Sequence, residues 1–365
     1  MWPASPSTAP SPARAMRLSF VTVDVARIDE GVRLLGGVLQ RALAGASSAS
    51  RSAGSSGHRD ATIRRTMNPI TPLHVTLAEA GLQVSGLHAS AQAGSPRLLL
   101  LHGWPEWSQA WRPVMERLAE RFELLAPDLR GFGDTEPAAS GPASDAGPDR
   151  HAADLLELLD RLGWERVGIV AHDVGSFVAQ ALARRAPLRV GGLFFFNCAY
   201  PGIGARWVEP GHLGEVWYQF FHQQAWAAEL VGSSRAACSV YLRHLLSHWS
   251  HRREWVAPAL EGWVDQFMKP GRLQGGFNWY RSVHQARMAV IEGRAAPLPP
   301  LPQPTRVLWG AHDPVLKAAW TDRLHEHFSD LRLEVLPDAG HFVHLEQPDR
   351  AALEIGRFFE GLTSH

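Results

Sequence analysis

Continuous apolar runs recur along the chain, each bounded by turn-forming residues. They cover residues 97–103, 122–129, 166–173, 191–198, 305–313 and 331–341. Apolar residues that do not alternate with polar ones are typical of strands buried on both faces, as in a parallel sheet. Helical patterns lie between the runs, for example over residues 151–163, and an amphipathic pattern ends the chain over residues 345–362. This alternation predicts an α/β fold around a mostly parallel sheet.

One long segment interrupts the alternation. Residues 201–295 are helical in pattern and hold seven of the fourteen Trp residues. A helical block inserted between two strands of a parallel sheet would lie over the carboxyl ends of the strands, where open α/β sheets bind ligands. We therefore predict an α/β core made of residues 67–200 and 296–365, with residues 201–295 as a helical cap, or lid.

The first 66 residues differ in composition from the rest. They are rich in Ala, Ser, Pro and Gly, and they carry nine Arg against four acidic residues. Such a composition predicts a disordered or non-core extension. Two interpretations remain open: a targeting segment, or translation from an upstream start with Met67 opening the domain.

The overall charge limits the classes of partner. Lys and Arg number 36, as do Asp and Glu, so the formal net charge is zero. This balance argues against nucleic acid or an anionic membrane as the main partner.

There is no apolar run of 18 residues, so we expect no membrane span. The two Cys residues fit a reducing, cytoplasmic location, and no pattern in the chain indicates an oligomeric state.

Three polar residues follow predicted strands. Asp173 ends one strand, Asp313 ends another and His341 follows the last. A nucleophile, an acid and a histidine in this chain order match the triad of α/β-hydrolases, with Asp where Ser often stands. A carboxylate at a sharp strand-to-helix turn could attack a substrate and form an ester, while the first N–H groups of the helix stabilise the developing charge.

Each of these residues has a structural alternative. Asp173 and Asp313 could each be the N-cap of the helix that follows, since Asp is a favoured cap. His344 competes with His341, although Gly340 directly before His341 favours the latter.

Several motifs together resemble the soluble epoxide hydrolases of the α/β-hydrolase superfamily, over residues 70–362. They are "HGWPE" at 102–106, "DLRGFGDT" at 128–135, "AHDVGS" at 171–176, "WYQFFHQ" at 217–223, "GGFNWYR" at 275–281 and "GHFVHLE" at 340–346. The resemblance implies an α/β-hydrolase fold, a mostly parallel sheet with an inserted helical cap. One departure is Ala171, where the family usually has Gly two residues before the nucleophile.

The resemblance also implies how an epoxide would be opened. Asp173 corresponds to the nucleophile that attacks a ring carbon. Tyr218 and Tyr280 correspond to the cap tyrosines that hydrogen-bond the epoxide oxygen and act as acids, which suits a leaving alkoxide that needs a proton.

The second step follows from the same resemblance. His341, oriented by Asp313, would activate the water that breaks the ester. The backbone N–H groups of Trp104 and Val174 would stabilise the oxyanion, and a cis peptide is expected between Trp104 and Pro105. The product is a vicinal diol, and no metal or other cofactor is expected.

The substrate is expected to be a small apolar epoxide. Aromatic residues of the predicted cap would line its pocket; they are Trp217, Phe220, Phe221, Trp226 and Phe277.

Two other functions stay open. A haloalkane or haloacetate dehalogenase would use the same Asp, His and acid. Haloacetate dehalogenases usually carry Arg directly after the nucleophile, where this chain has Val174, and haloalkane dehalogenases do not need two phenols, so Tyr218 and Tyr280 favour the epoxide. A non-catalytic ligand-binding protein on the same scaffold would lack a member of the triad.

Overall fold

The computed structural model describes residues 68–136 and 146–363, and within them it contains one eight-stranded sheet. The strand order across the sheet is β1-β2-β4-β3-β5-β6-β7-β8. β1 pairs antiparallel with β2 and β2 with β4, and every other pair is parallel. The strands are β1 (Ile70–Leu77), β2 (Leu82–Ala89), β3 (Arg97–Leu101), β4 (Glu123–Pro127), β5 (Val167–His172), β6 (Val190–Phe196), β7 (Thr305–Gly310) and β8 (Leu331–Leu336).

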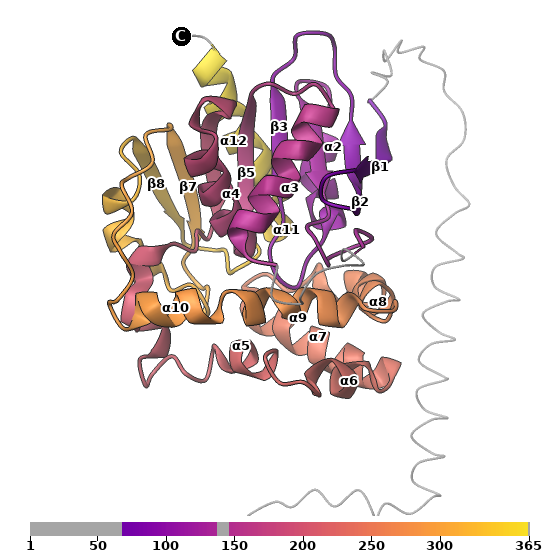
Figure 1. The fold of residues 1–365 in the computed structure, drawn as a ribbon, viewed down its shortest axis with the longest axis vertical. Coiled ribbons are helices and arrows are strands. Elements are labelled where there is room, and N and C mark those ends of the chain that lie inside the picture. Colours follow the sequence, from indigo (N-terminus) through magenta and orange to yellow (C-terminus); the bar gives the residue numbers. More distant parts are fainter. Residues whose placement is uncertain (1–67, 137–145, 364–365) are drawn as a thin grey trace, which may run out of the picture. The chain divides into compact units, whose positions relative to one another are not determined.

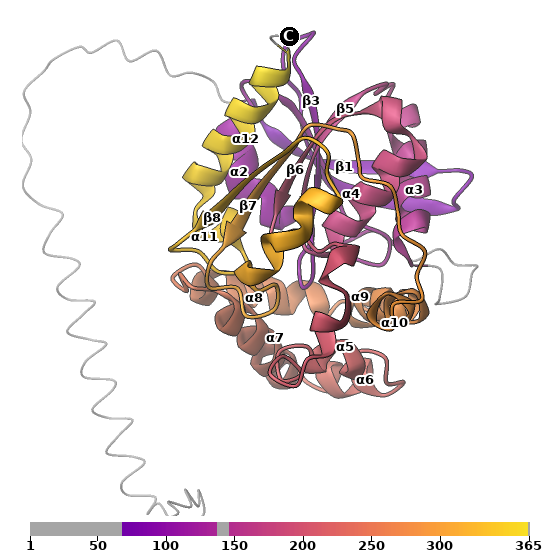
Figure 2. The same cartoon turned by 90° about the vertical axis from the view of Figure 1, so that its left-hand side faces the viewer.

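Helices cover both faces of this sheet. Figures 1 and 2 show α3 and α4 on one face and α2 and α12 on the other. The elements of this part of the chain are η1 (Ser108–Trp111), α2 (Arg112–Leu118), α3 (Pro148–Arg161), α4 (Val174–Arg185), η2 (Pro187–Arg189), η4 (Ala318–Glu326), α11 (Val343–Glu346) and α12 (Pro348–Thr363), where η denotes a 3₁₀ helix.

The apolar run of β3 explains why the strands read as continuous hydrophobic segments. Leu99 and Leu101 pack into one core cluster with α3 and α4, and Leu98 and Leu100 pack into a second cluster with α2 and α12. Because successive side chains of a strand point to opposite faces, both sets must be apolar when both faces are covered.

The fold class predicted from the sequence is confirmed. Each of the six predicted runs contains one strand, and the helices predicted over residues 151–163 and 345–362 correspond to α3 and α12. The antiparallel pair β1 and β2 was not predicted. β1 lies at the edge of the sheet, and exposed positions recur along it, so it lacks the continuous apolar signal of the central strands.

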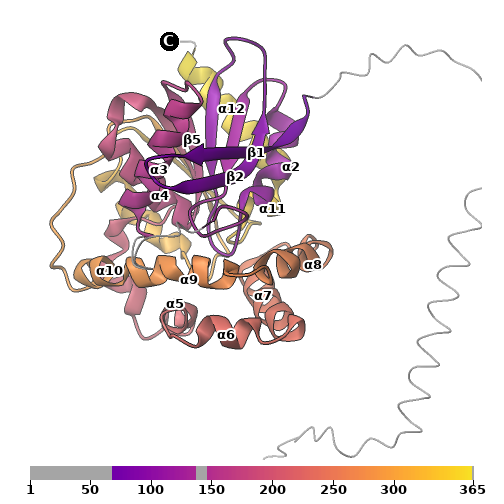
Figure 3. The same cartoon turned by 45° about the vertical axis from the view of Figure 1, so that its right-hand side comes forward.

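The inserted segment forms a layer of helices, here called the helical layer (residues 201–295). It lies below the sheet in Figures 1 and 3. Its elements are η3 (Pro201–Val208), α5 (Trp217–Phe221), α6 (Ala227–Gly232), α7 (Arg235–Trp249), α8 (Val256–Phe267), α9 (Arg272–Ser282) and α10 (His284–Ile291).

Contacts fix which end of the sheet the helical layer meets. Trp263 of α8 donates its Nε1–H to the backbone oxygen of Pro105, which follows β3, at 2.8 Å. Gly275 of α9 lies against the loop after β4, where an added Cβ would stand 2.0 Å from the oxygen of Gly131. The layer therefore meets the carboxyl ends of the strands.

The predicted extension of residues 1–66 and the proposed start at Met67 lie outside the described residues. Among the helices that are described, none combines the length and the apolar character needed to cross a lipid bilayer.

Candidate active site

Asp173 occupies the turn between β5 and α4. Its φ of 48° lies in the left-handed region that non-glycine residues rarely adopt. The turn is tight, since a Cβ added to Gly175 would stand 2.5 Å from the oxygen of Leu101. Although Asp173 is at the N-cap position of α4, its side chain makes no capping hydrogen bond. Its Oδ1 instead accepts a hydrogen bond from the backbone N–H of Trp104 at 3.0 Å. The carboxylate is therefore presented to the site and not used as a cap.

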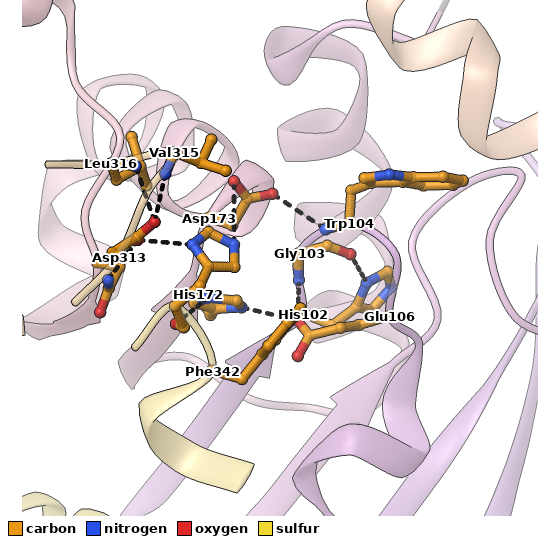
Figure 4. Close-up of polar contacts among 12 residues, drawn as sticks. His102, Gly103, Trp104, Glu106, His172, Asp173, Asp313, Val315, Leu316 and Phe342 are labelled. Atoms are coloured by element: carbon orange, nitrogen blue, oxygen red, sulfur yellow. Dashed lines mark hydrogen bonds and ion pairs between the residues drawn. The ribbon is translucent and has the colours of Figure 1, made fainter. Parts of the chain in front are cut away.

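His341 lies between the two predicted aspartates. Its Nδ1 is 2.7 Å from Oδ2 of Asp313, and its Nε2 is 3.8 Å from Oδ2 of Asp173. Figure 4 shows the side chains of Asp173 and Asp313 at the site. The residues come from the ends of three different strands, and the structure brings them together.

The surroundings of His341 favour its charged form. Burial by itself lowers the pKa of this imidazole, but the Coulombic attraction and hydrogen bond of Asp313 outweigh it, with a further contribution from Asp173. Together they raise the pKa of His341 to about 9. The imidazolium is thus stabilised as long as both carboxylates are ionised.

Asp313 is held by four donors. Its Oδ1 accepts the backbone N–H groups of Val315 and Leu316 at 2.8 and 2.9 Å. Its Oδ2 accepts Nδ2 of Asn197 at 2.5 Å, in addition to His341. Asn197, at the carboxyl end of β6, was missed in the sequence analysis. A polar residue ending a buried apolar strand was the available signal.

Tyr218 and Tyr280 come from α5 and α9 of the helical layer. Their rings are 5.6 Å apart and nearly perpendicular, and the side chains are buried. Burial raises the pKa of both phenols, and the negative charge of Asp173 raises each further. The two hydroxyl groups are therefore protonated at neutral pH and lie within the electrostatic reach of Asp173.

The expected cis peptide between Trp104 and Pro105 is present. It belongs to the loop that carries the N–H donor to Asp173. Val174, the second predicted oxyanion donor, is the first residue of α4 and directly follows Asp173.

Comparison with known proteins places the chain in a family. Residues 96–348, more than half of the chain, match the family described as alpha/beta hydrolase fold. The chain belongs to this family.

Several relatives are named as epoxide hydrolases. Epoxide hydrolase 4 of Homo sapiens is 26% identical over 287 residues, which is 76% of each chain. The soluble epoxide hydrolase of Corynebacterium sp. (strain C12) is 29% identical over 285 residues, 75% of this chain and 93% of the relative. A solved structure of the epoxide hydrolase CorEH is 26% identical with a TM-score of 0.68, covering 80% of this chain and 100% of the other. The resemblance stated from the sequence motifs is confirmed, and these relatives support a hydrolase.

The buried carboxylate of Glu106 contacts several loops of the site. Oε2 of Glu106 accepts the backbone N–H of Gly103 at 2.8 Å and lies 2.7 Å from Nδ1 of His172, and Oε1 lies 2.9 Å from Nε2 of His344. Nε2 of His172 donates to the backbone oxygen of His341 at 3.0 Å. Burial raises the pKa of Glu106, but the two histidines outweigh it and hold that pKa well below its usual range. Figure 4 shows Glu106 beneath the loop that carries Trp104.

This triplet is also the one group of described residues whose spacing would suit a metal ion. The ligand atoms of Glu106, His172 and His344 all lie within 4.8 Å of one another. Oε2 of Glu106 already binds His172 and the N–H of Gly103, whereas Oε1 and Nε2 of His344 face each other at 2.9 Å without a hydrogen bond among the described residues.

The five predicted pocket residues divide into two groups. Phe277 is fully buried, with its ring 5.5 Å from that of Trp104, and Phe221 packs 6.3 Å from Phe277. The structure does not bring the other three into this cluster; their exposed fractions are 39% for Trp217, 38% for Phe220 and 53% for Trp226. α5 buries Tyr218 and Gln219, which leaves Trp217 and Phe220 on the more exposed side of the helix, and Trp226 directly precedes α6.

Proposed function

We propose that the protein is an epoxide hydrolase that converts an apolar epoxide and water into a vicinal diol through a covalent ester on Asp173. One observation carries the proposal. Tyr218 and Tyr280 are buried side by side in the helical layer, and the ring of Tyr280 is 6.1 Å from that of Trp104, whose N–H binds Asp173. A nucleophile and proton donors on opposite sides of one site are what epoxide opening requires.

In the first step Asp173 attacks a ring carbon. The backbone N–H of Trp104 holds Oδ1, so Oδ2 is the oxygen free to form the new bond. The carbon–oxygen bond of the ring breaks, and Tyr218 or Tyr280 protonates the departing oxygen. Because burial raises the pKa of both phenols, each still carries its proton at neutral pH when the ring opens.

In the second step His341 removes a proton from water, and the water oxygen attacks the ester carbonyl. Oδ1 becomes the oxyanion and stays next to the N–H of Trp104, with the N–H of Val174 as the second donor. The bond between this carbonyl carbon and the diol oxygen then breaks, and His341 gives its proton to the departing oxygen. The remaining proton of the water is released as Asp173 regains its charge, and it restores the phenol. Ester formation removes the negative charge of Asp173, which is one cause of the raised pKa of His341. The first step therefore lowers the pKa of His341, which makes the imidazole more available as the base of the second step.

A dehalogenase is the second candidate. Nε1 of Trp104 is buried without a hydrogen-bond partner among the described residues, and an indole N–H can bind a leaving halide. A halide leaves without a proton, however, and would make no use of the phenols of Tyr218 and Tyr280.

The test uses the purified full-length protein with styrene oxide and, in parallel, a small haloalkane. Formation of the diol, measured by chromatography and lost in Asp173→Asn, is the expected result. Halide release without diol would establish the dehalogenase instead. Binding of styrene oxide without turnover of either compound would indicate a non-catalytic ligand-binding protein.

A further inference from the structure

His222 is a buried histidine that lies among the residues of the candidate site. It directly follows α5, and its imidazole is fully buried. One face of the ring stacks on Phe277, with centroids 3.9 Å apart and planes 15° from parallel. The ring centroid also lies 4.6 Å from that of Tyr280, 4.8 Å from that of Trp104 and 5.5 Å from that of Tyr218. Ring contacts therefore place this imidazole in the site that the mechanism uses.

A hydrogen bond to Tyr241 of α7 fixes which nitrogen of the imidazole carries the proton. Burial lowers the pKa of His222 well below its usual range, so the ring is neutral and holds one N–H. Its Nε2 is hydrogen-bonded to the hydroxyl of Tyr241. If Nε2–H donated, both Nδ1 and the phenol O–H would lack a partner within the described residues, whereas a donating phenol leaves only Nδ1 unpaired. The phenol therefore donates to Nε2, and the proton of the imidazole is on Nδ1.

The Nδ1–H group of His222 is a buried donor without an acceptor. Nδ1 makes no hydrogen bond to any described residue. The two nitrogens of an imidazole point away from each other, so Nδ1 is directed away from the hydroxyl of Tyr241. The neighbouring indole has the same feature, because Nε1 of Trp104 is also buried without a partner in the described part of the chain. An unpaired buried donor is unfavourable, so such a group in a binding site indicates an acceptor on the ligand.

The charges around His222 favour a neutral acceptor. The imidazole and the indole of Trp104 carry no charge, and the backbone N–H of Trp104 binds the carboxylate of Asp173 at 3.0 Å. An anionic ligand group would approach this carboxylate without a positive charge from either donor, whereas a hydroxyl or ether oxygen avoids that repulsion. Because His222 also contacts Tyr280, a proton donor to the epoxide in the proposed mechanism, the acceptor belongs close to the epoxide ring.

We propose that His222 is a specificity-determining residue whose Nδ1–H binds a neutral oxygen that the substrate carries beside the epoxide ring. The inference rests on the proposed function and narrows its substrate class to apolar epoxides with a hydroxyl or ether oxygen next to the ring. Tyr241 is a positioning residue, because its hydroxyl keeps the proton of the imidazole on Nδ1. Stacking on Phe277 fixes the plane of the imidazole and so the direction of the donor.

The test uses two pairs of epoxides in which an oxygen is exchanged for a carbon of similar size. One pair is benzyl glycidyl ether and its analogue with a methylene in place of the ether oxygen. The other is phenylglycidol and its analogue with a methyl in place of the hydroxyl. The selectivity of a protein for each pair is kcat/KM of the oxygen compound divided by kcat/KM of the carbon compound.

His222→Phe keeps an aromatic ring against Phe277 and removes the N–H. For at least one pair its selectivity should be about 2- to 10-fold below that of the wild type, the range expected for one neutral hydrogen bond. Intrinsic differences in epoxide reactivity cancel, because both proteins are given the same compounds. Tyr241→Phe should lower the selectivity less, since the imidazole then keeps an N–H that can move to Nε2.

His244→Phe is the matched control, because His244 is an exposed histidine of the same layer, on α7. It should keep the wild-type selectivity for both pairs. An unchanged selectivity of His222→Phe for both pairs would overturn the proposal, as would an equal loss of selectivity in His244→Phe.

Nitrogen NMR of protein that contains isotope-labelled histidine reports the position of the proton without any turnover. It should find the proton of His222 on Nδ1 in the wild type and shared between the two nitrogens in Tyr241→Phe. A wild-type proton on Nε2 would contradict the proposal.

Calorimetry separates this proposal from the proposed function. The diol derived from benzyl glycidyl ether should bind the wild type more tightly than the diol of its methylene analogue, and His222→Phe should abolish that preference. This result would support the role of His222 even if no epoxide is hydrolysed, and equal binding of the two diols to the wild type would contradict it.

Discussion

Replacing His341 with Gln should change how the stability of the protein depends on pH. The folded-state pKa of His341 is about 9, and that of an unfolded histidine is about 6.5. A pKa raised by folding contributes stability that is fully present below pH 6.5 and is lost as the pH rises through 9. The difference between the two pKa values corresponds to about 3 kcal/mol. Gln at this position keeps much of the side-chain volume and has no proton to lose.

Urea unfolding of the wild type and His341→Gln at pH 6 and pH 9.5 measures this contribution. Other titrating groups are common to both proteins and cancel in the difference between them. The free energy of unfolding of the wild type should fall by about 3 kcal/mol more than that of the variant over this range. An NMR titration of the imidazole gives the folded-state pKa directly.

Two results would refute the reasoning. One is an equal pH dependence of unfolding in the two proteins. The other is an imidazole that titrates near pH 6.5, because Asp313 would then not stabilise the imidazolium as the 2.7 Å contact implies.

Tyr218→Phe and Tyr280→Phe should each slow ester formation on styrene oxide by up to about 10²–10⁴-fold, and the double variant should be inactive; stopped-flow kinetics that show full activity in both single variants would remove the tyrosines from the mechanism. Gly275→Ala should destabilise the protein by about 1–3 kcal/mol, because the new Cβ would overlap the oxygen of Gly131; an unchanged thermal midpoint would contradict that close packing. Glu106→Gln should cost about 3–5 kcal/mol in urea unfolding, since it removes a buried charge that the surrounding histidines balance; a loss below about 1 kcal/mol would show that the network is not ionic.

The strands of the central sheet could be predicted because the signal for each strand lies in its own residues. Strands covered on both faces need uninterrupted apolar side chains, as the run of β3 illustrates. The edge strand β1 has exposed positions along its length, and its pairing with β2 depends on contacts between segments, so no local pattern identified it.

The candidate site also divides into residues that the sequence could predict and residues whose role depends on distant contacts. Asp173, Asp313 and His341 each end or follow a strand, and the carboxyl ends of parallel strands meet at one edge, so their proximity was predictable. The roles of Asn197 and Glu106 depend on which partners their side chains find, and those partners are distant in sequence. The pocket prediction included Trp217, Phe220 and Trp226 because composition does not tell which face of a helix is buried.

The most direct test of the account is the mass of His341→Gln after exposure to styrene oxide, once the wild type has been seen to hydrolyse it. The ester should form on Asp173 and not break, because the base that activates water is gone. Intact-protein mass spectrometry should then find the protein plus one styrene oxide, and peptide mapping should locate the added mass on Asp173. An unmodified variant, or a modification on another residue, would contradict the ester mechanism.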